Sequence, residues 1–334
     1  MTYTIPSGKY DTDGKKLNLK PGDIINLNPI VKYGSLQFSN LLGTPENPIV
    51  IDLGKYEFNV TGKSYGIRTV NCKYFKIVAD GAHIFGSNTG LSLDYLSSDF
   101  EVEGLEIYNT GFAGIMAKTD PSCNDPKTWR DNFTMRNISI HDNYVHDTGG
   151  EGLYVGNTSY CGGLHLECGT KFPHAIEGAK IFNNRVENTG WDGMQLGSCV
   201  KDGEVFNNRI TNYGTKNKDN QKSGIQVSEQ GSIYGNKINK GSGNGIIALA
   251  GNKIERNIIR NAGTNGIFTD VRCMTGTFVI KHNAILDSVD NAIDARTLSD
   301  IQNNLCTEQI AGKPEWAKNN FVDKELKSIL ELMT

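Results

Sequence analysis

The chain has 334 residues, a formal net charge of −3 and an isoelectric point near 6.1, and 37% of its residues are hydrophobic. This balance disfavours nucleic acid as a partner, because phosphate binding requires a basic stripe and the lysines and arginines are spread along the chain. No apolar run reaches the roughly 18 residues that a membrane-spanning helix needs. We therefore expect no transmembrane segment.

Short alternating phrases recur along most of the chain. Each begins with a small residue and then alternates apolar and variable positions, as in Gly66-Ile-Arg-Thr, Gly114-Ile-Met-Ala, Gly152-Leu-Tyr-Val and Gly193-Met-Gln-Leu. A period of two predicts short β-strands. Helical periodicity appears only at residues 324–332, which predict a short C-terminal helical cap over the last open edge.

A second phrase occurs seven times between residues 140 and 304. It consists of an apolar residue, two other residues, an asparagine, one more residue and a second apolar residue. The asparagines follow one another at 21 to 28 residues, with a single step of 41, and are Asn143, Asn184, Asn208, Asn236, Asn257, Asn283 and Asn304. A repeat at this scale predicts a solenoid. We expect the asparagine amides to bond to those above and below in a ladder, because turn formation alone would not keep them in register.

Both phrases together predict an all-β fold, a single-stranded right-handed parallel β-helix with three short strands per coil and roughly ten coils. This layout resembles the pectate-lyase-like β-helix superfamily. Residues 19–27 and 43–51 are similar to the opening coils of the chondroitinase B and alginate lyase group. The resemblance implies the fold and leaves the activity open, because many chemistries share this scaffold. The Lys and Arg catalytic pair of the chondroitinase B group has no counterpart in any phrase here.

The repeat runs without a linker, so one elongated domain is expected. Its parts are the N-terminal capping coils at 1–62, the regular coils at 63–310 and the C-terminal cap at 311–334.

Three stretches of the chain exceed the spacing of the coils. They lie near 118–134, 156–178 and 213–222. Inserted loops tend to carry function in solenoids, because the coils themselves are interchangeable. We expect these loops to wall the outer face of the sheet formed by the Gly-apolar-x-apolar strands.

Four of the seven cysteines fall in three successive coils. Cys123, Cys161, Cys168 and Cys199 lie at bridging distance in principle, with three connectivities if all four pair. We expect one or two disulfides between the loops, with buried or idle thiols as the alternative.

Two acids precede the strand glycines in consecutive coils. Glu151 and Asp192 occupy a position that Ser223, Asn244 and Asn265 take in later coils. Stacked strands would place the two backbones about 5 Å apart. Two carboxylates that close repel each other, so one pKa rises, as a general acid and its partner require. A separation near 5 Å matches retaining glycoside hydrolysis. The alternatives are a backbone hydrogen-bonding role in the turns, or calcium binding with loop carbonyls, so calcium is a possible cofactor and none is certain.

The outward positions of the same strands suit sugar hydroxyls. Tyr154, Gln195 and Gln226 are expected to form a polar, aromatic-led strip between the loops. Trp191, Arg130, His165 and His174 complete the predicted substrate-binding residues. His146 and Lys118 are further catalytic candidates. His146 is expected to face outward on the strand before Glu151, and Lys118 could neutralise a uronate in an elimination reaction.

The leading hypothesis is a secreted carbohydrate-active enzyme that cleaves a polysaccharide or oligosaccharide lying across the first sheet. The paired acids favour a glycoside hydrolase slightly over a polysaccharide lyase. The alternative is a non-catalytic glycan-binding or adhesive β-helix, such as a surface protein or a phage tail-spike segment. The first residues contain no signal-peptide core. Because such solenoids mostly work outside the cell, we expect an extracellular, periplasmic or cell-surface location with the leader removed. The sequence gives no prediction of the oligomer.

Overall fold

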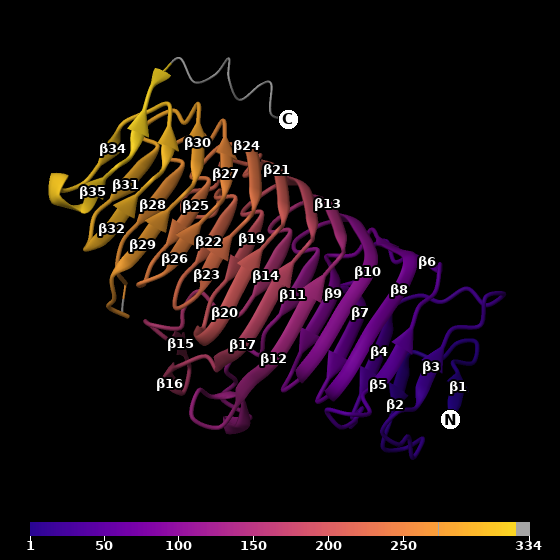
Figure 1. Ribbon diagram of the computed structural model, residues 1–334. Helices are drawn as coiled ribbons and strands as arrows, with labels where there is room; N and C mark the ends of the chain where they lie inside the picture. The colour runs from indigo at the N-terminus through magenta and orange to yellow at the C-terminus, as the bar shows by residue number, and fades with distance from the viewer. Residues whose placement is uncertain (273, 325–334) are drawn as a thin grey trace.

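The computed structural model describes residues 1–272 and 274–324. Its strands wind into a right-handed parallel β-helix, as the sequence predicts, and Figure 1 shows the coils stacked from the N-terminus to the C-terminus. The predicted helix at 324–332 lies outside the described residues except for Lys324. None of the helical segments within the described part of the chain is long and apolar enough to cross a membrane.

The Gly-apolar-x-apolar phrases form one parallel sheet, the first sheet, with one strand per coil. Within the described residues it has 12 strands, which are β2 (Asp11–Asp13), β4 (Leu36–Ser39), β7 (Tyr65–Val70), β9 (Thr89–Asp94), β11 (Ile115–Ala117), β14 (Leu153–Val155), β19 (Met194–Leu196), β22 (Ile225–Val227), β25 (Ile246–Ala248), β28 (Ile267–Thr269), β31 (Ile293–Ala295) and β34 (Ile310–Ala311).

The other strands of each coil form the large sheet, which bends around the asparagine corner. Its strands are β1 (Thr2–Thr4), β3 (Ile24–Asn26), β5 (Ile49–Asp52), β6 (Glu57–Asn59), β8 (Lys73–Phe85), β10 (Ser98–Thr110), β12 (Thr134–His141), β13 (Tyr144–Thr148), β17 (Ala175–Phe182), β18 (Arg185–Thr189), β20 (Cys199–Phe206), β21 (Arg209–Tyr213), β23 (Ser232–Tyr234), β24 (Lys237–Gly241), β26 (Lys253–Glu255), β27 (Ile258–Arg260), β29 (Phe278–Lys281), β30 (Ala284–Leu286), β32 (Ser299–Gln302), β33 (Leu305–Cys306), β35 (Ala317–Lys318) and β36 (Phe321–Val322).

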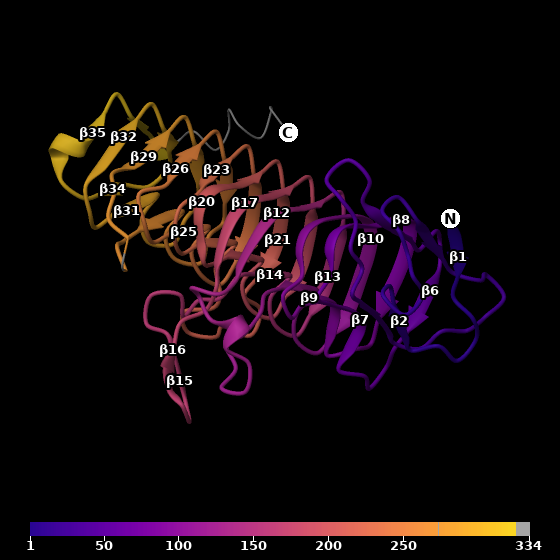
Figure 2. The same ribbon diagram turned by 90° about the horizontal axis from the view of Figure 1, so that it is seen from below.

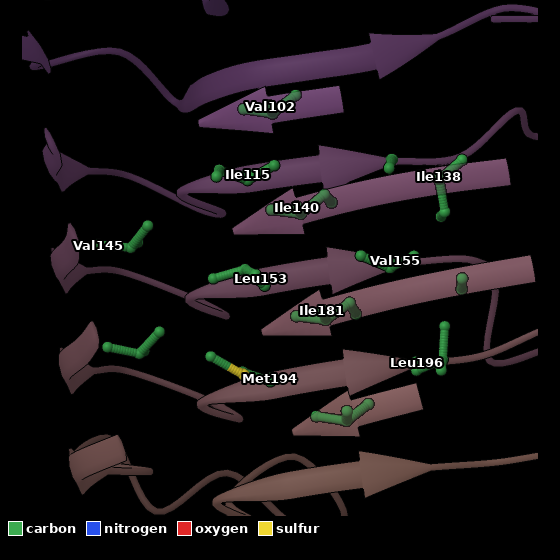
Figure 3. Packing of buried hydrophobic residues seen from close by; sticks show 14 of the residues in the cluster. Val102, Ile115, Ile138, Ile140, Val145, Leu153, Val155, Ile181, Met194 and Leu196 are labelled. Carbon is green, nitrogen blue, oxygen red and sulfur yellow. The ribbon is translucent and has the colours of Figure 1, made fainter. Parts of the chain in front are cut away.

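The core is a set of stacked apolar rows inside the solenoid. Ile115, Leu153 and Met194 are register partners on successive rungs of the first sheet and are buried. Figure 3 shows them facing side chains of the large sheet such as Ile140 and Ile181. Burial of each such side chain contributes roughly 1.5–3 kcal/mol relative to exposure, so the repeated alternation stabilises every coil in the same way.

The buried asparagines form a continuous ladder at the corner of the large sheet. The Asn184 side-chain nitrogen donates to Asn208 Oδ1 at 3.1 Å, and that of Asn208 donates to Asn236 Oδ1 at 3.0 Å. Each amide nitrogen also donates to a backbone carbonyl, as Asn208 does to Ile181 at 2.9 Å. The residue before the ladder position has positive φ, 54° at Asn183, which asparagine tolerates better than most residues. The corner is therefore satisfied in polar contacts although it is buried.

The glycines that open the first-sheet strands are required by close packing. A Cβ at Gly193 would lie 2.6 Å from the Gly224 carbonyl oxygen and 2.6 Å from Ile210 Cγ2. Atoms do not approach so closely without displacement, so no larger residue fits at Gly193 unless its neighbours move.

We expect Gly193→Ala to destabilise the protein by about 1–3 kcal/mol or more, as overpacking does. The matched control is Gly162→Ala in a loop, where a Cβ would meet nothing within 4 Å. Urea denaturation of both variants tests this, and equal midpoints would contradict it.

Two of the inserted loops are linked to each other and together form the structure that we call the wall. The loop near 118–134 contains the 3-10 helix η1 (Pro126–Thr128), and the loop near 156–178 contains the antiparallel hairpin β15 (Leu164–Leu166) and β16 (Gly169–Lys171). Figure 2 shows this hairpin projecting from the solenoid. A second 3-10 helix, η2 (Pro314–Trp316), lies near the C-terminal end.

A disulfide between Cys123 and Cys168, with a Cα–Cα distance of 5.7 Å, connects the two loops. Cys161 is also disulfide-bonded. Cys199, included among the predicted bridging residues, is a free and buried thiol, so that part of the prediction is wrong. It is the first residue of strand β20 and lies in the apolar core.

Candidate functional site

Glu151 and Asp192 lie on neighbouring rungs at one edge of the first sheet. The Gly114 amide donates to the Glu151 carbonyl at 3.1 Å, and the Gly152 amide donates to the Asp192 carbonyl at 3.1 Å. Both side chains are 0% exposed. The two acids therefore occupy consecutive positions of one column, in the coils whose loops are long.

The same column carries hydrogen-bonded amides in later coils. The Asn265 side-chain nitrogen donates to Asn244 Oδ1 at 3.1 Å, and that of Asn291 donates to Asn265 Oδ1 at 2.8 Å. The two acids thus precede a second amide ladder in the same column, and Ser223 lies between Asp192 and its first member, Asn244. A purely structural role would be met by asparagine or glutamine at these positions, which the chain uses elsewhere.

The carboxyl groups are poorly satisfied by the protein. Asp192 Oδ1 accepts the Ser223 amide at 2.6 Å. Asp192 Oδ2 and both carboxyl oxygens of Glu151 have no hydrogen-bond partner. Leaving a buried polar atom unpaired costs about 1–3 kcal/mol. These three oxygens therefore favour a ligand or water molecules at this place.

Burial raises both acid pKa values. The pKa of Asp192 rises from 3.8 to about 8 because the group is desolvated, against the Ser223 amide, and the charge of Glu151 adds to the rise. Desolvation also raises the pKa of Glu151 from 4.5 to about 7, and the field of its own backbone amide and the ammonium groups of Lys218 and Lys118 oppose this rise. We expected mutual repulsion to be the main cause and one pKa to rise. Instead burial dominates and both rise.

Stability should consequently fall as the pH rises. Both acids have higher pKa values in the folded protein than in the unfolded chain, so folding is coupled to their protonation. Their contribution to the free energy of unfolding is complete below about pH 4 and is lost as the pH rises through 7 to 8. We expect the melting temperature of Asp192→Asn, relative to wild type, to increase from pH 5 to pH 9. Glu151→Gln should give a smaller slope, because its pKa is raised less. Parallel curves for wild type and both variants would contradict the assignment.

The polar strip predicted on the outer face is enclosed. Tyr154, Gln195 and Gln226 are register partners on consecutive rungs, as the repeat predicts. Tyr154 is half-buried, but Gln195 is 0% and Gln226 is 2% exposed, so the expectation of an open strip is wrong for the two glutamines. Neither amide atom of Gln195 has a hydrogen-bond partner. The strip is a covered polar layer next to the two acids.

Aromatic rings and two lysines lie beside this layer. The Phe112 ring is 5.5 Å from that of Trp191 and 6.0 Å from that of Tyr154, between ring centres. The rings can meet because the intervening position is Gly150, where a Cβ would lie 2.8 Å from Phe112. The Lys218 ammonium lies 3.2 Å from the centre of the Trp191 ring. A sugar that stacks on Trp191 would take the place of this ammonium.

Lys118 is held as a cation. Its ammonium lies 4.7 Å from the centre of the Tyr154 ring and 2.9 Å from Asp120. Burial acts to lower the pKa of Lys118, but Tyr154 and Asp120 outweigh it and the pKa is raised. Lys118 is therefore placed to neutralise negative charge and is a poor proton acceptor.

The side chains of Arg130 and His174 make contacts within the two disulfide-linked loops. The Arg130 guanidinium lies 3.8 Å from the centre of the Tyr160 ring and 4.7 Å from that of Phe172. His174 accepts the Thr119 amide at Nε2, and its Nδ1 bonds the Ala175 carbonyl at 2.9 Å. Burial lowers the pKa of His174 to about 4. Both groups support the loops and have little capacity left for a sugar.

The structure does not bring His146 or His165 to the acids. His146 lies on β13 of the large sheet and stacks between Tyr108 and Tyr144, at 5.0 and 4.3 Å between ring centres. It faces outward as predicted, but on a different face of the solenoid from the first sheet. His165 lies on the projecting hairpin, where Nδ1 is 2.9 Å from Thr170 Oγ1.

Glu229, a further buried acid with a raised pKa, was not predicted. It follows strand β22 by two residues, is 1% exposed, and accepts the Ser198 amide. Burial raises its pKa to about 7, against Ser198 and the guanidinium groups of Arg272 and Arg130. Arg272 also acts on Asp192. The sequence signal, an acid two residues after a first-sheet strand, was missed because we looked for acids only before the glycines and at the outward positions of the strands.

Potential metal ligands gather elsewhere. Among the described residues, Glu101, Glu103 and His141 on the large sheet offer ligand atoms within 4.8 Å of one another. The Lys76 ammonium lies 2.6 Å from Glu101 and already neutralises it. Calcium at Glu151 and Asp192 stays a prediction.

Comparison with known proteins defines the family. Residues 138–306 match the family model described as right handed beta helix region, and the chain therefore belongs to the right-handed β-helix family. No curated protein sequence matches the chain.

Solved structures with this fold include enzymes and a viral protein. A GH136 lacto-N-biosidase from Eubacterium ramulus is 14% identical, with a TM-score of 0.57 and coverage of 97% of this chain and 67% of that one. The siphovirus 9NA tailspike receptor binding domain is 11% identical, with a TM-score of 0.55 and coverage of 96% and 70%. An alginate lyase from Paenibacillus sp. str. FPU-7 is 15% identical, with a TM-score of 0.52 and coverage of 91% and 97%. At these identities the likeness establishes the fold alone.

Proposed function

We propose that this protein is a glycan-cleaving enzyme in which Asp192 and Glu151 transfer protons at the glycosidic bond. The observation that carries the proposal is the pair of buried acids with unpartnered oxygens, in a column that holds amides in the later coils, from Asn244 onward. Such groups cost stability, which makes a purely structural role a poor explanation for them.

Asp192 is suited to be the general acid. With a pKa of about 8 it is mostly protonated at neutral pH, and Oδ1 accepts the Ser223 amide, which leaves Oδ2 to carry the proton. Oδ2 would donate to the oxygen of the leaving sugar. Glu151, with a pKa of about 7, is partly ionised at neutral pH and would act as the carboxylate partner, a base or a nucleophile.

The surroundings fit a sugar substrate. Gln195 has two unused amide atoms, and Tyr154 and Trp191 provide rings beside the acids. The GH136 lacto-N-biosidase and the alginate lyase have this fold, which is compatible with glycan chemistry on this scaffold. We further propose an extracellular, periplasmic or cell-surface location, because the Cys123–Cys168 disulfide persists best in an oxidising compartment.

A panel of neutral and acidic polysaccharides and oligosaccharides tests the proposal, with reducing ends and ultraviolet absorbance followed together. New reducing ends without an absorbance gain would support hydrolysis. A gain in both would indicate elimination, and the roles of the acids would be reassigned. Binding without any product across the panel would favour the adhesive alternative.

A further inference from the structure

A cationic pocket lies on the outer face of the large sheet. It has a volume of about 310 Å³ and is formed by β21, β24 and β27, which Figure 1 shows side by side. Its lining residues are Arg209, Thr211, Lys237, Asn239, Arg260 and the apolar Ile258 and Ile238.

The parallel register brings the positive charges together. Arg209 and Lys237 are register partners on adjacent rungs, which are about 4.8 Å apart in parallel sheets. Thr211 and Asn239 are partners in the neighbouring outward column, and Arg260 follows Asn239 in that column. The pocket thus combines cationic groups with a hydroxyl and an amide on a rigid backbone.

The protein offsets the charges of Arg209 and Lys237 only in part, because Arg209 helps to lower the pKa of Glu187 without forming an ion pair with it. Neither forms an ion pair with a carboxylate within the described residues, and both are exposed. The acid nearest in register is Glu187, which is held by Arg185 at 2.8 Å and by the Tyr144 hydroxyl at 3.0 Å. Like charges on adjacent rungs repel each other. This arrangement therefore costs stability unless an anion binds.

We propose that this pocket binds the oxyanion groups, sulfate or carboxylate, of an acidic polysaccharide. A guanidinium presents a fork of N–H donors to such groups, and an ammonium adds a point charge. A chain with a net charge of −3 does not attract polyanions in general, so binding would be local to the pocket. The pocket lies on the large sheet, and its occupation does not depend on the chemistry of Glu151 and Asp192.

Binding of dextran sulfate, carboxymethyl dextran and unmodified dextran of equal length tests this by calorimetry. We expect both charged polymers to bind and dextran not to bind. The double variant Arg209→Gln/Lys237→Gln should weaken binding at least tenfold. The control, Lys180→Gln/Lys253→Gln, makes the same charge change in a different column of the large sheet and should stay within about twofold. Both double variants should melt like the wild type or higher, since the four residues are exposed.

Several outcomes would overturn the proposal. Equal weakening in the two double variants would assign binding to net charge, and no binding of either charged polymer would leave the pocket without this ligand. Inorganic sulfate that binds as tightly as dextran sulfate would assign the pocket to a free anion.

A preference between sulfate and carboxymethyl groups, lost in Arg209→Gln/Lys237→Gln alone, would support the proposal and identify the oxyanion.

Discussion

Glu151→Gln and Asp192→Asn should each lower turnover of the glycan substrate by about 10²–10⁴-fold, the usual contribution of a positioned proton-transfer group. Both variants should fold, because amides occupy this column in later coils, where Asn244 and Asn265 bond to each other. Initial rates of reducing-end release, with substrate affinity measured separately, check the prediction.

The control for these variants is Asp294→Asn. Asp294 is an acid on the outer face of the same sheet, and it pairs with Arg296 at 3.3 Å in a later coil. Its replacement should leave turnover unchanged. Full activity in Glu151→Gln and Asp192→Asn, with folding intact, would remove the pair from the mechanism.

Asn208→Ala should lower the free energy of unfolding by about 3–5 kcal/mol. The Asn208 amide donates to the Ile181 carbonyl and to Asn236, and its oxygen accepts the backbone and side-chain N–H groups of Asn184. The substitution leaves these buried partners unpaired and also opens a cavity. Chemical denaturation at constant pH measures the loss.

Asn239→Ala is the comparison for the ladder. Asn239 is exposed and accepts a single side-chain bond, from Asn261 at 3.0 Å. We expect it to cost less than about 1 kcal/mol, as most surface substitutions do. A similar loss in both variants would mean that the ladder adds little beyond turn formation.

The fold follows from the sequence because each coil repeats the same local solution. The asparagine phrase specifies the corner, and the alternation of apolar residues specifies which face of each strand is buried. The position of Glu151 beside Asp192 could be predicted from this register alone.

What the repeat does not encode is how the loops fold back over the sheet. Gln195 was expected at the surface because its strand position faces outward, yet it is buried there. His146 is only five residues from Glu151 in the sequence, so we expected it near the acids. The chain passes from the large sheet to the first sheet within these five residues, and the two side chains lie on different faces. The burial of Glu229 could not be predicted from the repeat either. Its burial results from contacts with residues of other coils, such as Ser198.

The Cys123–Cys168 disulfide closes a ring of chain with a sequence separation of 45 residues, and Glu151 lies inside that ring. A solenoid can fray coil by coil from its ends, because each coil contacts only its neighbours. In the entropic model, a disulfide that closes a loop of this length lowers the entropy of the unfolded chain and so stabilises the folded state by about 4 kcal/mol. Fraying that begins at either end should therefore meet its highest barrier at the coil of Glu151. A protease acting on the native protein would then leave this coil as the centre of the resistant fragment.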